Sequence, residues 1–139
     1  MRVLAIDFGT KRIGLAISDE KQTIANALST IEVKNNNYML AIHQIQKLVK
    51  YYNNIELILL GYPLMLNDQK SRTTLAVEQF HQLLLKNIDL PVQLIDEQYS
   101  TKETISFLKQ TAELKGSQIK KIKDKLAAQH LLTKYLEQK

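Results

Sequence analysis

An apolar run that ends on a carboxylate, turns through a glycine and returns apolar is the feature that most constrains this chain. Residues 3–6 read VLAI, Asp7 follows them, and residues 13–17 read IGLAI. A continuous apolar run of this length is typical of a strand buried on both faces. Two such runs joined by a short turn at Gly9 predict an antiparallel pair of strands at residues 2–7 and 13–18. Asp7 then ends a buried strand beside a tight, basic turn.

The rest of the chain alternates strand and helix patterns. Further strands are expected at residues 23–32, 55–61 and 92–96, and helices at about residues 38–52 and 71–86. A third helix is expected to begin at Ser100, which has capping-box spacing to Glu103. Gly116 and Ser117 separate it from a final helix that runs to about Leu136. Strands separated by a helix run parallel through right-handed crossovers. The expected fold is therefore α/β, with a mixed sheet of five strands. The first three strands are antiparallel, the last two are parallel, and helices pack on the sheet.

Composition narrows the class of protein. The 139 residues are 45% hydrophobic, which fits one domain over 1–139 with a real core. The absence of cysteine excludes disulfides and thiolate metal sites. No apolar run approaches the roughly 20 residues that span a bilayer, and the start lacks the apolar stretch of a signal peptide. We expect a cytoplasmic protein without a membrane partner.

Acidic residues follow two of the predicted strands where each strand ends. The apolar strands end at Asp7, at Gly61, and at Asp96 followed by Glu97. Open α/β sheets bind ligands beyond the carboxyl ends of their strands, so we expect these acids to meet at one edge. The alternative is that Asp7 is an ordinary turn residue and that Asp96 and Glu97 mark the exit of a strand into solvent.

The last helix adds a third acid. Its apolar stripe at helical spacing consists of Ala127, Ala128, Leu131, Leu132 and Tyr135. One turn back along this stripe lies Asp124, on the face expected to meet the sheet. A carboxylate there is costly unless it is paired, hydrogen-bonded or bound to a metal. The alternative is a helix that starts near Asp124 and uses it as a first-turn acid, which the helix dipole favours.

Three carboxylates in a small space should either raise a pKa or recruit cations. Asp7, Glu97 and Asp124 offer the oxygen ligands that Mg²⁺, or Mn²⁺ in its place, combines with water and substrate phosphate. Two such ions about 3.5 to 4 Å apart can drive hydrolysis of a phosphodiester bond. The histidines have no metal-ligand spacing and are interpreted as surface or packed helix residues: His43, His81 and His130.

The basic charge of the chain is concentrated in its last segment. Residues 1–108 carry 11 basic and 11 acidic residues, whereas residues 109–139 carry eight lysines against three acids. Five of these lysines lie within residues 115–125, among them Lys120, Lys121 and Lys123. Such a cluster can follow a phosphate backbone through counterion release. The alternative is an ordinary solvated helix face.

Four stretches of the sequence carry a family resemblance that covers nearly the whole chain. They read "AIDFGTKRIGLAISD", "LLGYPLMLND", "DEQYST" and "KDKLAAQHLL". In this order they resemble the signature blocks of the YqgF nuclease family. The resemblance implies a ribonuclease H-like fold. Members are described as Holliday junction resolvases and as nucleases that mature the precursor of small-subunit ribosomal RNA.

The resemblance also implies roles for individual residues. The metal-binding acids of the family fall on Asp7, Glu97 and Asp124, the same positions that strand ends and helix phase suggest. The residues implied to contact substrate phosphate or to match the family's hydroxyl pair are Lys11, Arg12, Ser100 and Thr101. Two departures stand out: Gln98 replaces a usual arginine, and Asn67-Asp68 replaces a usual Asp-Gly turn. The loss of the arginine affects substrate affinity more than metal binding.

We therefore expect a magnesium-dependent nuclease that acts on structured nucleic acid. An rRNA precursor is the first candidate substrate and a branched DNA junction the second, and the chain acts as a monomer or a homodimer. A nucleotide-binding phosphotransferase is one alternative, because "IDFGT" also resembles the phosphate loop of actin-like ATPases. Those proteins close a cleft between two related domains, for which this chain is too short. A non-catalytic RNA-binding module is the other alternative, although retention of all three acids argues against it.

Overall fold

The computed structural model describes residues 1–9, 11–62, 72–96 and 116–138, and for residues 62, 72–74, 96 and 116–125 it describes the backbone alone. The elements are β1 (Arg2–Asp7), β2 (Arg12–Ser18), β3 (Ala25–Glu32), α1 (Tyr38–Tyr52), β4 (Ile55–Tyr62), α2 (Arg72–Asn87), β5 (Val92–Asp96) and α4 (Gly116–Glu137). The helix expected from Ser100 lies outside the described residues.

The five strands form one mixed sheet in the order β3-β2-β1-β4-β5. β1 pairs antiparallel with β2, and β2 pairs antiparallel with β3. β4 runs parallel to β1, and β5 runs parallel to β4. The sheet expected from the sequence is thus confirmed, because a short turn reverses the chain whereas a helical connection returns it in the same direction.

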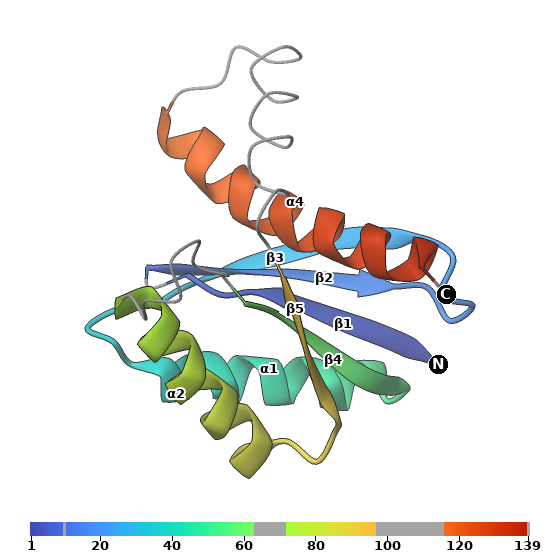
Figure 1. Cartoon of the computed structure of the whole chain (residues 1–139), viewed down its shortest axis with the longest axis horizontal. Coiled ribbons are helices and arrows are strands. Elements are labelled where there is room, and N and C mark those ends of the chain that lie inside the picture. Colours follow the sequence, from blue (N-terminus) through green and yellow to red (C-terminus); the bar gives the residue numbers. More distant parts are fainter. Residues whose placement is uncertain (10, 63–71, 97–115, 139) are drawn as a thin grey trace.

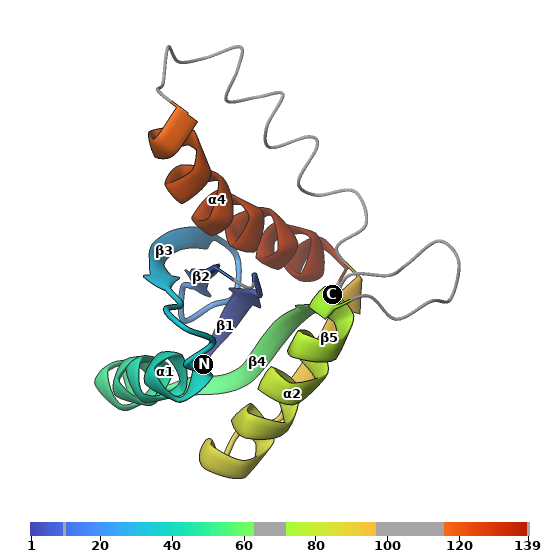
Figure 2. The same cartoon turned by 90° about the vertical axis from the view of Figure 1, so that its left-hand side faces the viewer.

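Helices cover both faces of the sheet. α1 and α2 lie on one side, and α4 crosses the other side over β1, β2 and β3 (Figure 1, Figure 2). The side chains of β1 alternate between the two layers, with Leu4 and Ile6 toward α1 and α2, and Val3 and Ala5 toward α4. All four are fully buried, so both faces select apolar residues. This two-sided burial explains the uninterrupted apolar run of β1.

The two core layers differ in the size of their side chains. Among the side chains that the structure describes, the layer under α4 contains four buried alanines, namely Ala5, Ala16, Ala25 and Ala128. The layer under α1 and α2 is built from larger residues and, over the same described part of the chain, contains one buried alanine, Ala41. Small residues let a helix approach the sheet closely, so the layer under α4 has less side-chain volume to exchange.

Three aromatic rings pack where β1 leaves the sheet. The ring of Phe8, the residue after β1, lies 4.9 Å from the ring of Phe80 on α2 and 5.4 Å from the ring of Tyr38, the first residue of α1. Phe8 and Phe80 are buried. This contact fixes the chain directly after Asp7 against both helices.

Candidate active site

The parallel register brings the carboxyl ends of β1, β4 and β5 to one edge of the sheet. Ile6 pairs with Leu60, so Asp7 ends β1 beside Gly61. Gly61 pairs in turn with Ile95, and Asp96 is the last residue of β5. Asp7 and the end of β5 are therefore two strand spacings apart, roughly 10 Å. The predicted edge exists, and the chain continues from Asp96 directly to Glu97.

The turn after β1 is built around a glycine that no other residue can replace without movement. A Cβ on Gly9 would lie 2.4 Å from the carbonyl oxygen of Arg12. The far side of the turn is held by a backbone hydrogen bond, because the N–H of Val33 donates to the carbonyl of Lys11 at 2.8 Å. Lys11 is exposed, and Arg12 and Asp7 are half-buried. A carboxylate and two cations thus share one short, constrained turn.

Asp124 lies well inside α4. The helix begins at Gly116 and has no acidic residue in its first turn, so the alternative in which Asp124 starts the helix is wrong. Asp124 precedes Ala127 and Ala128 by one turn, and both alanines are buried against the sheet. The helix is also tied to β3, because the side-chain amide of Gln129 donates to the carbonyl of Ala25 at 3.0 Å. The backbone of Asp124 therefore lies within α4, one turn before the buried alanines, while the structure does not describe its side chain, so its place in the site stays a prediction.

The other predicted site residues are described in part or not at all. Glu97, Ser100 and Thr101 lie outside the described residues. Lys120, Lys121 and Lys123 lie in the first half of α4, where the backbone alone is described. Among the described residues no three His, Cys, Asp or Glu side chains form a metal-binding group. Of the three predicted ligands only the Asp7 side chain is described, so the ligand set stays a prediction.

A second aspartate, which sequence reasoning passed over, ends β2 at the opposite edge of the sheet. The Asp19 carboxylate accepts hydrogen bonds from the N–H of Ile24 at 2.9 Å and from the N–H and hydroxyl of Thr23, each at 2.7 Å. The Ile24 N–H, followed by the Thr23 hydroxyl, lowers the pKa of Asp19 to about 2. A carboxylate followed by a hydroxyl residue in a polar stretch is the signal for such a turn. Asp19 holds the link between β2 and β3 and is distant from Asp7.

The mixed five-strand sheet with helices on both faces is a ribonuclease H-like fold. RuvC from Thermus thermophilus in complex with a Holliday junction substrate superposes with a TM-score of 0.62 over 99% of this chain and 94% of that chain, at 14% sequence identity. Another Thermus thermophilus RuvC structure gives a TM-score of 0.59 at 13% identity, over 99% and 95% of the two chains. At these identities the likeness shows the fold alone.

Sequence comparison gives the family. The family model described as "RuvX: Holliday junction resolvase" matches residues 1–138, and the chain belongs to this family. A protein of Mycoplasmopsis synoviae named "Putative pre-16S rRNA nuclease" is 39% identical over 99% of this chain and 98% of its own length. A protein of Dictyoglomus turgidum with the same name is 37% identical over 99% and 94%. The resemblance inferred from the four sequence blocks is confirmed, and the chain is a nuclease.

No helix among the described residues is both long and apolar enough to cross a membrane.

Proposed function

We propose that this nuclease hydrolyses phosphodiester bonds in the precursor of 16S rRNA, and that Asp7, Glu97 and Asp124 hold Mg²⁺, or Mn²⁺ in its place. The observation that carries the proposal is the position of Asp7. It ends the central strand β1 beside Gly61, at the edge where β5 delivers the chain to Glu97. The names of the relatives support an RNA precursor as substrate.

The described donor chemistry fits a hard divalent cation. Asp7 is half-buried, so its carboxylate is partly withdrawn from water, and carboxylate oxygens are the ligands that Mg²⁺ takes from proteins. Magnesium bound at this edge supplies a Lewis acid that activates water and stabilises the leaving oxygen of a phosphodiester. Cysteine is absent from the whole sequence, and the carboxylates are hard donors, which favours Mg²⁺ or Mn²⁺ over thiophilic metals.

The remaining site residues bind and orient the substrate. Lys11 and Arg12 stand on the same constrained turn as Asp7, and their positive charge attracts the phosphate next to the bond that is cut. Ser100 and Thr101 follow Glu97 closely in the sequence and supply hydroxyl donors. The lysines of α4 extend the contact to neighbouring phosphates: Lys120, Lys121 and Lys123. We further propose that the chain acts as a single domain over 1–139 in the cytoplasm.

Cleavage of two labelled substrates tests this function. A precursor rRNA fragment and a four-way DNA junction are incubated with Mg²⁺, with Mn²⁺ or with EDTA. The wild type is compared with Asp7→Asn, and Asp89→Asn, an exposed acid outside the site, is the matched control. We expect metal-dependent cutting of the RNA, lost in Asp7→Asn and retained in Asp89→Asn, while thermal unfolding shows that both variants are folded.

The same experiment separates the alternatives. Cutting of the junction but not of the RNA would make branched DNA the substrate, and a homodimer in solution would then be required to cut two strands. Salt-dependent RNA binding without any cleavage would favour a non-catalytic RNA-binding module. An Asp7→Asn variant that cuts as fast as the wild type would refute the assignment of this residue.

A further inference from the structure

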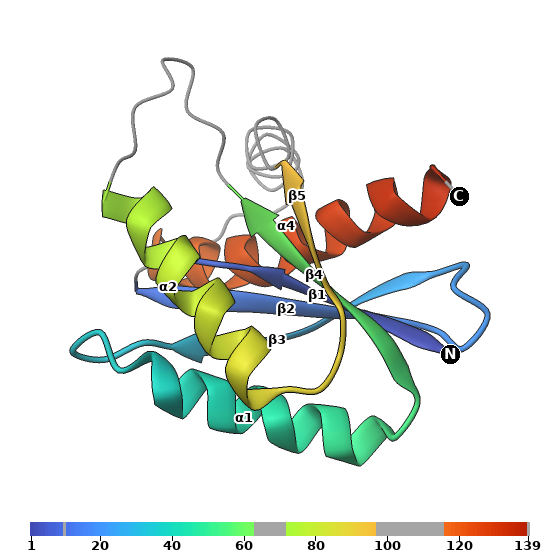
Figure 3. The same ribbon diagram turned by 60° about the horizontal axis from the view of Figure 1, so that its bottom comes forward.

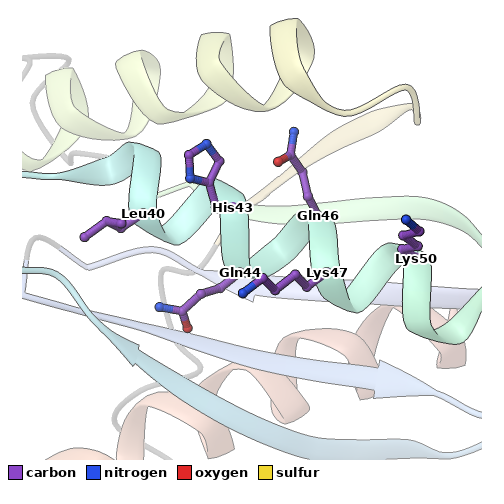
Figure 4. A pocket seen from close by; sticks show the side chains of 6 residues that line it. All are labelled: Leu40, His43, Gln44, Gln46, Lys47 and Lys50. Carbon is purple, nitrogen blue, oxygen red and sulfur yellow. The ribbon is translucent and has the colours of Figure 1, made fainter.

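The outer face of α1 carries side chains that the proposed active site does not use. Leu40, Gln44 and Lys47 form one row along the helix, and His43, Gln46 and Lys50 form a second row toward α2 (Figure 4). Together these six residues line an open hollow of about 490 Å³. Tyr51 continues the first row by one helical turn, and its side chain is 79% exposed. We call these seven residues the α1 surface.

The charge of this face has one sign. Between Val33 and Ile55 the sequence contains Lys34, Lys47 and Lys50 and no aspartate or glutamate. Lys47 and Lys50 are exposed, and among the described residues neither makes an ion pair. A helix face that serves solubility alone usually intersperses both signs. The α1 surface instead combines ammonium groups, side-chain amides and an exposed aromatic ring.

The start of α1 is anchored beside the turn that follows Asp7. The ring of Tyr38, at the start of α1, lies 5.4 Å from the ring of Phe8. Val33, which precedes Lys34, donates its N–H to the carbonyl of Lys11. α1 starts at the end of the sheet where β1 turns into β2 and runs from there toward the opposite end (Figure 3). Its 15 residues extend about 22 Å away from the active-site edge.

Nucleic acid is the partner whose chemistry matches this face. Ammonium groups and amides are typical donors to phosphate and sugar oxygens, and an exposed aromatic ring is a platform on which a base can stack. His43, Lys47 and Lys50 are separated by four and three residues, so they stand one helical turn apart on neighbouring positions. A strand held at Lys11 therefore finds further donors along α1 without leaving the protein surface.

We propose that the α1 surface is a second contact for the RNA substrate and binds the sugar-phosphate backbone that flanks the cleaved bond. The proposal rests on the proposed function, since it assumes that nucleic acid is bound at the Asp7 edge. It assigns to α1 the part of substrate affinity that depends on RNA length. An acidic protein is the competing occupant of a face with this charge.

Binding of two RNAs tests the proposal. Both contain the cleavage region, and the long one extends about ten nucleotides further on each side, which is enough to reach along α1. Affinity is measured in EDTA over a range of salt concentrations. The Lys47→Gln/Lys50→Gln variant is compared with Lys21→Gln/Lys134→Gln, which removes the same charge from the turn between β2 and β3 and from the far end of α4.

We expect the α1 variant to lower the ratio of long-RNA to short-RNA affinity roughly tenfold at 0.1 M salt. Its salt dependence with the long RNA should fall in slope by about 1.4 to 1.8, which is 0.7 to 0.9 for each lysine. The control variant should keep the wild-type affinity ratio and the wild-type salt slope. Affinity for polyglutamate, which stands in for an acidic protein, is measured on the same variants, and its loss in the α1 variant should be smaller than the loss of affinity for the long RNA.

Three results would overturn the inference while leaving the proposed function standing. The α1 variant could behave as the control does, it could lose long and short RNA equally, or it could keep its RNA affinity and lose only affinity for polyglutamate, which would indicate an acidic protein partner. A wild-type chain that binds neither RNA would instead refute the proposed function, and this inference with it.

Discussion

Replacement of Gly9 by alanine should displace the turn that carries the proposed active site. The added Cβ would lie 2.4 Å from the carbonyl oxygen of Arg12, whereas real Cβ contacts begin at 3.0 Å and are ordinary from 3.4 Å. The backbone must therefore open by about 0.6 to 1.0 Å. Because the obstructing atom belongs to the backbone, no side-chain rotation can relieve the overlap. The displacement falls between Asp7 and the two cations of the turn.

The expected magnitudes follow from that displacement. A misplacement of about 1 Å in an active site can cost 100-fold, so kcat/KM of Gly9→Ala should fall by about that factor. Inserting a methyl group into a closely packed site costs about 1 to 3 kcal/mol of the free energy of unfolding. For a chain of this size that lowers the melting temperature by roughly 3 to 12 °C.

Rates of RNA cleavage and thermal unfolding of the same preparations measure the two effects. Asn26→Ala, which also ends in alanine but changes an exposed side chain on β3, serves as the control and should leave both quantities near their wild-type values. If Gly9→Ala cleaved RNA at the wild-type rate and melted at the wild-type temperature, the turn would not be constrained as described. A loss of stability without a loss of cleavage would separate the turn from catalysis.

Further outcomes can be checked on the same protein. Phe80→Ala removes a fully buried ring that packs on Phe8, and chemical denaturation should show a loss of about 3 to 5 kcal/mol. The pKa of Asp19 is about 2 in the folded chain against 3.8 for a free side chain, so its hydrogen bonds stabilise the fold fully above about pH 4, and this contribution is lost as the pH falls toward 2. The free energy of unfolding, measured between pH 2 and pH 7 for the wild type and for Asp19→Asn, gives this contribution. The free energy of unfolding of the variant should depend less on pH between pH 2 and pH 4. Removal of divalent metal with EDTA should stop cleavage without unfolding the protein, and restored cleavage on adding Mg²⁺ completes the test.

Most strand and helix bounds could be predicted because burial dictates them. β1 and β5 have the bounds expected from the sequence, since their residue patterns are short and clearly delimited. β3 begins two residues later than expected, at Ala25, because the preceding residues are held in the turn around Asp19. Side chain to backbone bonding of this kind competes with strand pairing, and hydrophobic periodicity does not register it.

The site was predictable where it depends on topology. The shared edge of Asp7 and the end of β5 follows from parallel pairing, which the sequence indicates through its helical crossovers. The role of the α1 surface could not be predicted, because Lys47 and Lys50 alone look like the solvated face of any amphipathic helix. The proposed role depends on where α1 begins relative to the turn after β1. That position is set by the contact between Tyr38 and Phe8, which are 30 positions apart in the sequence.

The alanine-rich layer under α4 has a consequence for how this sequence can diverge. In the layer under α1 and α2, a substitution to a smaller side chain can be compensated by a larger side chain at a neighbouring position, because large residues there pack against one another. Ala5, Ala16 and Ala128 have little volume to exchange, and any larger residue at these positions lifts α4 from the sheet. That helix carries Asp124, while the strand beneath it carries Asp7. A larger residue in this layer would therefore move the backbone that carries Asp124 relative to β1, so volume changes that are tolerated on one face of the sheet are destabilising on the other.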